Sequence, residues 1–148
     1  MVFREEKLSD GMLKQLVSLS SDWEAEQSCY GYRKNEPADI EGNRVFAAYC
    51  EETLIGYLFG KRETAIKDTS VMPAQTTYFE VEELYVKPAH RSKGVGRRLF
   101  ALLEETMKGE GVEYILLSTA TKNYRAVLHF YIDELEMQFW NARLFKRI

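Results

Sequence analysis

The 148-residue sequence has few features of a secreted, metal-binding or membrane protein. It has only two cysteines, Cys29 and Cys50, and their spacing does not match that of a metal site. It has no N-terminal signal peptide and no apolar run long enough to cross a bilayer. We therefore expect a reduced, cytoplasmic protein with neither a metal ion nor a membrane partner.

Positive charge is also scarce, except in one segment. The chain has 20 Lys and Arg against 23 Asp and Glu, which gives a net charge of -3 and a pI near 5.5. Residues 87–98 contain no acidic residue and five cations, namely Lys87, Arg91, Lys93, Arg97 and Arg98. A nucleic-acid-binding protein would have a broad basic face and a high pI. The pattern instead favours one small anionic ligand at residues 87–98.

The length and composition predict one globular domain. A chain of 148 residues can bury a core but is too short for two ordinary domains. With 45% hydrophobic and 29% charged residues, it also has no room for a long disordered tail. We expect a single domain over residues 1–148.

The first half of the chain predicts a strand, helices and a hairpin. A strand at residues 2–8 precedes a helix that Ser9 caps, with an apolar stripe of Met12, Leu13, Leu16, Val17 and Leu19. A second, less regular helix would begin near Ser21, and its aromatic residues suit either the core or a substrate wall. The β-rich runs 44–50 and 54–60 predict a hairpin. Residues 63–76 then form a loop that is a candidate substrate-facing flap.

The second half predicts alternating strands and helices. Residues 76–86 predict a long strand and residues 95–107 an amphipathic helix, which Gly109 and Gly111 end. A strand at 112–119, a helix at 123–135 and one or two final strands in 137–148 would follow. This order indicates an α/β or α+β fold around a mixed, mostly antiparallel sheet flanked by helices.

The turn between the strand 76–86 and the following helix has the properties of an anion site. Unpaired N–H groups of the first helical turn converge there, and Gly94 and Gly96 permit close approach. No Lys-Ser or Lys-Thr follows the last glycine, so the turn is not a nucleotide-binding P-loop. The glycine spacing also differs from the dinucleotide fingerprint.

The run Arg91-Ser92-Lys93-Gly94-Val95-Gly96, directly after "ELYVKPAH", resembles the acetyl-CoA pyrophosphate loop of the GNAT superfamily of N-acetyltransferases. The resemblance extends from about Tyr78 to the C-terminus and implies a GNAT-like domain with acetyl-CoA as cosubstrate. Backbone N–H groups from Ser92 to Arg97, including Val95, would hold the pyrophosphate. The side chains of Arg91, Lys93 and Arg97 would add positive charge.

The same resemblance implies how the rest of the cofactor binds. The strand segment Leu84-Tyr85-Val86 would splay from its neighbour at a bulge, so that the backbone of Leu84 and Val86 pairs with the pantetheine arm. Asn123 matches the cofactor-contacting asparagine at the start of a later helix. It is also a good helix cap.

Acetyl transfer to an amine needs a proton acceptor, because a lysine-like amine has a pKa of about 10.4 in water. Glu82 matches the commonest position of the family's base, while Glu80 and Glu83 remain alternatives. Strand alternation would place Glu80, Glu82, Leu84 and Val86 on one face and Val81, Glu83 and Tyr85 on the other. Tyr131 matches the tyrosine that lies near the thioester sulfur in the family, which implies a general acid.

Two positions depart from the family pattern. Asn123 and Tyr131 are eight residues apart, one more than usual, which would turn one of them by about 100° on an α-helix. Glu136 stands where the family often has a glycine, which disfavours a left-handed end to the helix.

The expected function is therefore acetyl-CoA-dependent N-acetylation of a primary amine. A CoA-binding sensor or assembly domain without turnover is the alternative. The acceptor is a small-molecule or protein amine. The acidic residues of the chain favour a cationic acceptor, but only by charge complementarity. The resemblance also makes a homodimer through the final strands or the sheet edge one of the expected states.

Overall fold

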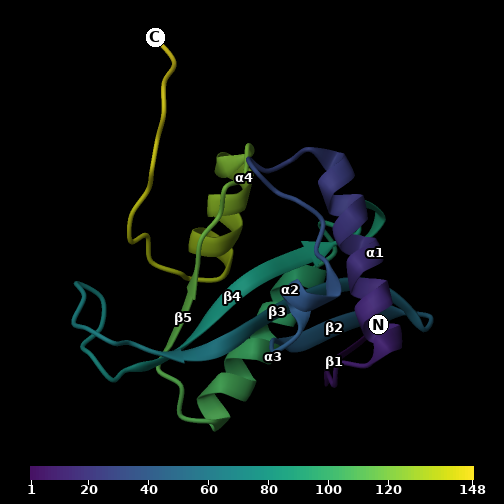
Figure 1. Ribbon diagram of the computed structural model, residues 1–148, viewed down its shortest axis with the longest axis horizontal. Helices are drawn as coiled ribbons and strands as arrows, with labels where there is room; N and C mark the ends of the chain where they lie inside the picture. The colour runs from purple at the N-terminus through teal and green to yellow at the C-terminus, as the bar shows by residue number, and fades with distance from the viewer.

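The computed structural model describes residues 1–148 and contains one five-stranded sheet in the order β1-β2-β3-β4-β5 (Figure 1). The first four strands are antiparallel neighbours, and β5 runs parallel to β4. Their bounds are Val2–Glu6, Arg44–Cys50, Thr53–Thr64, Thr77–Val86 and Tyr114–Leu117. A mixed, mostly antiparallel sheet was the prediction, and it is confirmed.

Helices cover both faces of this sheet. The longer ones are α1 (Asp10–Glu26) and α3 (Val95–Gly109), on opposite faces. The shorter ones are α2 (Pro37–Ile40), the 3₁₀ turn η1 (Pro88–His90), α4 (Tyr124–Leu128) and the π-helical turn η2 (His129–Glu134). No helix combines the length and the apolar character that crossing a membrane would require.

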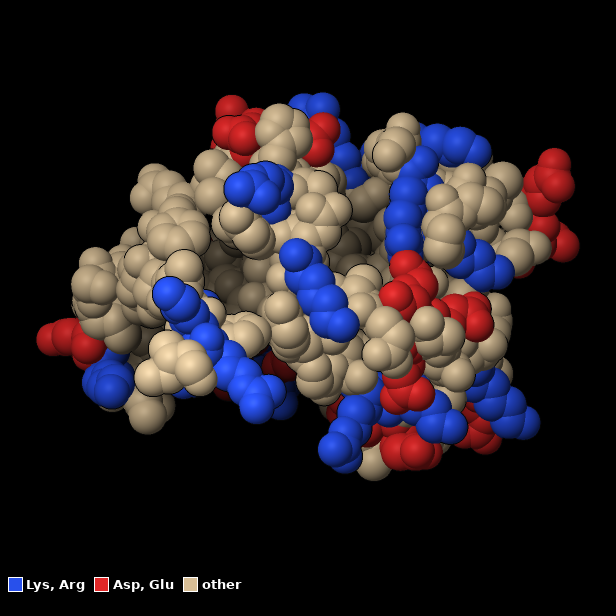
Figure 2. Space-filling view, turned by 90° about the horizontal axis from the view of Figure 1, so that it is seen from above, with Lys and Arg blue, Asp and Glu red and all other residues tan.

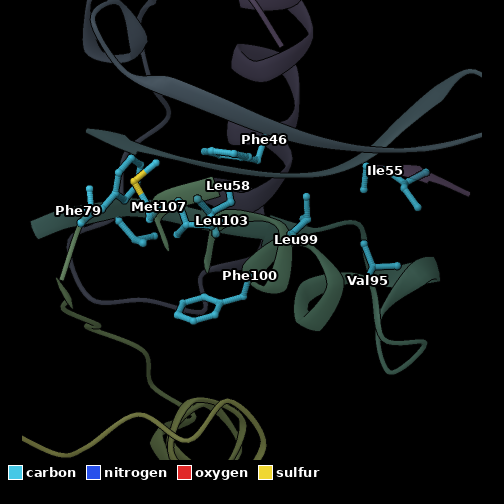
Figure 3. Close-up of a cluster of buried hydrophobic side chains, with 12 residues drawn as sticks. Phe46, Ile55, Leu58, Phe79, Val95, Leu99, Phe100, Leu103 and Met107 are labelled. Carbon is cyan, nitrogen blue, oxygen red and sulfur yellow. The ribbon is translucent and has the colours of Figure 1, made fainter. Parts of the chain in front are cut away.

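The apolar stripe of α3 forms one half of the core. Leu99 and Leu103 are fully buried against Phe46 and Leu58 of the sheet (Figure 3). The spacing of these helical residues follows the 3.6-residue period, so one face of α3 is apolar and the other is solvated. The helix that the sequence predicted here is confirmed.

The α1 stripe forms the other half of the core. Met12, Leu16 and Leu19 pack over Tyr57 and the neighbouring strands. The Ser9 side chain caps the helix by accepting a 3.1 Å hydrogen bond from the Met12 N–H, as predicted. The second helix predicted from Ser21 is wrong, because α1 continues unbroken to Glu26. It ends at Gln27, whose left-handed backbone donates its N–H to the Glu24 carbonyl.

A bulge interrupts β4 at Glu82. Phe59 pairs with Glu83 and Gly60 with Val81, so Glu82 has no opposite residue. Side chains therefore change faces across the bulge: Val81 joins Leu84 in the α3 half of the core, while Tyr85 packs in the α1 half. The sequence predicted that Val81 and Leu84 lie on opposite faces of this strand. That prediction is wrong, because the bulge adds one residue to the two-residue period.

The strands β4 and β5 separate beyond the bulge. Their pairing runs only from Tyr78 and Tyr114 to Val81 and Leu117. The remainder of β4 has no strand on that side, which is the splayed pair that the sequence predicted.

The predicted final strands are wrong. Residues 138–148 have no secondary structure, and the end of the chain runs away from the body (Figure 1). Several large side chains of this segment are exposed, namely Phe139, Trp140, Leu144, Phe145 and Ile148. Aromatic and β-branched residues favour a strand only where a neighbouring strand can pair with them, and this segment has none. The strand β5 is consequently an edge of the sheet.

Candidate active site

A cleft of about 360 Å³ opens where β4 and β5 separate. It contains seven of the predicted site residues, which lie far apart in the sequence: Glu82, Leu84, Tyr85, Val86, Arg91, Asn123 and Tyr131. Figure 2 shows the molecule from above, with a surface that is hollowed in places and carries Lys and Arg side chains beside the hollows. The remaining predicted residues, Ser92 to Arg97, do not line the cleft and form the adjacent turn.

This turn leads into α3 with two left-handed residues. Ser92 has a φ of 59° and Gly94 a φ of 80°, and Gly94 occupies the N-cap position without a side-chain cap. The N–H groups of the first turn consequently have no partner within the helix and add to its positive end. A Cβ at Gly96 would lie 3.2 Å from Cζ of Phe130, so glycine lets the turn pack closely on η2. These donors fit a pyrophosphate group.

Arg91 connects this turn to α1. Its Nη1 and Nη2 donate to Oε1 and Oε2 of Glu26 at 2.7 and 2.8 Å, and its Nε donates to the Val86 carbonyl at 2.8 Å. The hydrogen bond from Arg91 lowers the pKa of Glu26, and a second one from Tyr85 adds to the shift. In this structure the Arg91 charge is balanced by Glu26, and the Val86 carbonyl is occupied by Arg91.

The three candidate carboxylates differ sharply in their surroundings. Glu82 is exposed, forms no ion pair and lines the cleft. Glu83 also lines the cleft but is half-buried, and it accepts hydrogen bonds from Tyr57 Oη at 2.8 Å, Tyr32 Oη at 3.1 Å and Asn35 Nδ2 at 2.8 Å. Burial raises the pKa of Glu83, although these hydrogen bonds oppose the shift. Only Glu82 combines access to the cleft with unoccupied oxygens.

Glu80 lies outside the cleft lining. Its Oε2 is buried without a hydrogen-bond partner. Burial raises the pKa of Glu80, and the negative charges of Glu82 and Glu63 raise it further. A carboxylate in this setting destabilises the fold in its charged form.

The helix that carries Asn123 and Tyr131 contains a π turn. Asn123 Oδ1 caps α4 by accepting from the Ala126 N–H at 3.4 Å. The Leu135 N–H donates to the Phe130 carbonyl five residues earlier, at 3.0 Å, so η2 accommodates one residue more than an α-turn. Both side chains line the same cleft despite their eight-residue separation. The rotation expected for an α-helix does not separate them.

Tyr131 remains protonated well above neutral pH. Burial, and to a smaller extent the nearby Cys29, raises the pKa of Tyr131 to about 12. A half-buried phenol at the wall of a cleft can donate a proton or a hydrogen bond to a group that becomes negative there.

The end of this helix is left-handed in spite of Glu136. Glu136 has a φ of 60°, and the Met137 N–H donates to the Tyr131 carbonyl six residues earlier, at 2.9 Å. This bond satisfies a carbonyl of the last turn, as in a glycine-ended helix. The prediction that Glu136 disfavours such an end is wrong.

Sequence reasoning did not identify one wall of the cleft. Ser28 and Cys29 line it together with Ser118, Thr119 and Thr121. The two segments pair with each other, since the Tyr30 N–H donates to the Ala120 carbonyl and the Lys122 N–H to the Ser28 carbonyl, both at 2.9 Å. Pairing across about 90 residues leaves no local sequence signal. Residues 63–76 were predicted as a loop that forms a flap, but none of them lines the cleft, and the first two belong to β3.

Comparison with known proteins agrees with this geometry. The sequence matches the acetyltransferase (GNAT) family over residues 12–134. None of the curated proteins matches. A transcriptional regulator from Bacillus halodurans C-125 has a similar structure, with a TM-score of 0.72 and 20% identity over 99% of this chain and 100% of the other.

Two structurally similar proteins are acetyltransferases by name. One is aminoglycoside N-acetyltransferase AAC(6')-Iy in complex with the bisubstrate analogue CoA-S-monomethyl-acetylneamine, with a TM-score of 0.69 and 15% identity over 100% and 99% of the two chains. The other is a ribosomal-protein-alanine N-acetyltransferase from Brucella melitensis biovar Abortus 2308, with a TM-score of 0.69 and 13% identity over 99% and 100%. At these identities the likeness establishes a shared fold.

The chain therefore belongs to the acetyltransferase (GNAT) family. Its fold class and its family are those that the sequence predicted.

Proposed function

We propose that this acetyltransferase transfers the acetyl group of acetyl-CoA directly to a primary amine of a small molecule or a protein. The observation that carries the proposal is the cleft between β4 and β5. It holds a carboxylate with unoccupied oxygens, Glu82, and a protonated phenol, Tyr131, next to the glycine turn.

The cosubstrate would extend from the glycine turn into the cleft. Backbone N–H groups from Ser92 to Arg97, among them those of Lys93 and Val95, would bind the pyrophosphate. The free edge of β4 at Leu84, Tyr85 and Val86 would pair with the pantetheine arm, and Asn123 would contact it from the opposite wall. Arg91 would release the Val86 carbonyl in the same step, because its Nε occupies that oxygen here.

The chemistry would be a direct transfer. The neutral amine nitrogen attacks the thioester carbonyl carbon, so a C–N bond forms and the C–S bond breaks. The proton lost by the nitrogen passes to Glu82, directly or through a water molecule. The departing sulfur, whose thiol has a pKa of about 8.5, takes the phenol proton of Tyr131. Solvent returns the proton from Glu82 to Tyr131.

The first test concerns the cosubstrate site and has a matched control. Gly94 and Gly111 have similar left-handed φ values of 80° and 76°, and nothing lies within 4 Å of a Cβ at either position. Gly94→Leu and Gly111→Leu should therefore cost similar folding free energy. We expect calorimetry to detect acetyl-CoA binding to wild type and Gly111→Leu and not to Gly94→Leu. Equal binding by both variants would refute the proposed pyrophosphate site.

The second test separates an enzyme from a CoA-binding sensor. CoA release with a panel of primary amines should fall by about a hundredfold or more in Glu82→Gln, while acetyl-CoA binding is retained. Binding without turnover for every amine would support the sensor.

A homodimer is the proposed assembly. The edge strand β5 has no neighbour on its outer side, and exposed apolar side chains follow it in residues 138–148. An unpaired edge and an apolar segment are complementary surfaces for a second copy of the chain. Light scattering after size exclusion should give twice the monomer mass. Truncation of the chain after Gln138 should reduce the measured mass to that of a monomer.

We propose the cytoplasm as the location. Cys29 and Cys50 are both free thiols, which fits a reducing compartment. Imaging of a fluorescent fusion would test this.

A further inference from the structure

The β4 bulge places two consecutive carboxylates at the same cleft. In a regular strand Glu82 and Glu83 would point to opposite faces. Here Glu82 is the extra residue of the bulge, and both residues line the cleft. Two neighbouring acids are therefore available to one acceptor molecule, and their surroundings suit different tasks.

Glu83 is a half-buried carboxylate without a cationic partner. Its three hydrogen-bond donors, Tyr32, Tyr57 and Asn35, are all neutral, and it takes part in no ion pair. Glu26 on the neighbouring α1 shows the contrast, since Arg91 balances its charge with two hydrogen bonds. Partly buried carboxylates are ordinarily paired with a cation. Glu83 has no such partner within the protein.

The hydrogen bonds of Glu83 leave room for one more donor. A carboxylate has about four acceptor positions, and three of them are occupied here. A cation at the remaining position would offset the burial that raises the pKa of Glu83. The exposed and unpaired Glu82 keeps the role of base.

Aromatic rings surround the same position. The Trp23 ring lies 4.3 Å from the Tyr32 ring and 5.3 Å from the Tyr85 ring, measured between centroids, and Trp23 and Tyr85 line the cleft. These rings stack on one another, and the Arg91 guanidinium lies over the Tyr85 ring, so their faces are already covered. The site for an organic cation is therefore the Glu83 carboxylate itself, which is held by neutral donors at the wall of the cleft.

We propose that Glu83 binds a second ammonium group of the acceptor, so that the preferred substrate is a linear diamine or polyamine. This inference rests on the proposed N-acetyltransferase function. The neutral amine of such a substrate faces Glu82 and Tyr131, while its charged amine is held by Glu83. A monoamine of the same length can react but lacks the second contact.

Two ligands of equal length test this proposal. Calorimetric titrations of 1,4-diaminobutane and butylamine into the protein with bound CoA measure binding, and CoA release from acetyl-CoA measures turnover. We expect the diamine to bind wild type about tenfold or more tightly than butylamine, with a correspondingly lower KM. Glu83→Gln should abolish this difference by weakening diamine binding only. The control Glu63→Gln removes a partly exposed charge that lies outside the cleft and is paired with Lys61, and it should preserve the difference.

Each outcome bears on a separate claim. Equal affinity of wild type for the two amines, or a preference that persists in Glu83→Gln, would overturn the role of Glu83 even if both amines are acetylated. A diamine preference that disappears in Glu83→Gln, without turnover of either amine, would support the Glu83 site and refute the enzymatic function.

Discussion

At the scale of single residues, the site depends on how burial divides similar side chains into different roles. Glu80, Glu82 and Glu83 are nearly adjacent in sequence, yet burial raises the pKa of Glu80 and Glu83 while Glu82 is exposed. The sequence identified the three candidates but not their differences. These depend on Tyr32, Tyr57 and Asn35, which come from other parts of the chain.

Tyr131→Phe should lower kcat by about a hundredfold while leaving the affinity for acetyl-CoA nearly unchanged, because it removes only the proton donor. In wild type, the pKa of about 12 keeps the phenol protonated beyond the ordinary tyrosine pKa of about 10. Loss of kcat from phenol ionisation should therefore not begin by pH 10. Stopped-flow pH profiles of both proteins measure this, and an unchanged kcat in the variant would exclude the acid role.

Glu80→Gln should stabilise the protein at neutral pH. The pKa of Glu80 is raised in the folded state, so its favourable contribution is present below the unfolded pKa and is lost as pH rises through the folded value. A neutral amide avoids this loss. Urea unfolding should give a higher midpoint for the variant at pH 7 and little difference at pH 4. A lower midpoint at pH 7 would show that the Glu80 charge is compensated.

At the scale of elements, two irregularities shape the site: the bulge in β4 and the π turn in η2. The helix α3 and the glycine turn were predictable, since both depend on local periodicity and on residues that tolerate special backbone angles. A bulge was expected only from the family resemblance, and its position at Glu82 was not predicted, because it depends on the pairing of Phe59 and Gly60 with β4. The π turn has no comparable sequence signal, although it allows Asn123 and Tyr131 to share the cleft.

Gly60→Ala tests the bulge, with Gly109→Ala as its control. A Cβ at Gly60 would overlap the Glu80 carbonyl oxygen of the neighbouring strand, whereas nothing lies within 4 Å of a Cβ at Gly109 in α3. We expect Gly60→Ala to destabilise the fold by about 3 kcal/mol and to reduce turnover. Gly109→Ala should be neutral or stabilising by up to about 1 kcal/mol. Chemical denaturation measures both, and a neutral Gly60→Ala would show that the strands can separate without cost.

At the scale of the whole molecule, the cleft joins segments that are remote in sequence. Pairing of the Ser28–Tyr30 segment with residues 120–122, and of Arg91 with Glu26, encloses the space between β4 and β5. The order of strands and helices indicated the fold, but such contacts depend on the completed sheet. Residues 138–148 illustrate the same limit, since their β-rich composition finds no partner strand within the chain.

The central claim is that this cleft transfers acetyl groups from acetyl-CoA to primary amines. Its most direct test is mass spectrometry of reactions that contain acetyl-CoA, 1,4-diaminobutane or butylamine, and either wild type or Glu82→Gln. We predict N-acetylated amine and an equal amount of released CoA with wild type, and about a hundredfold less of both with Glu82→Gln. Absence of acetylated product with wild type, or equal amounts from the two proteins, would contradict the claim.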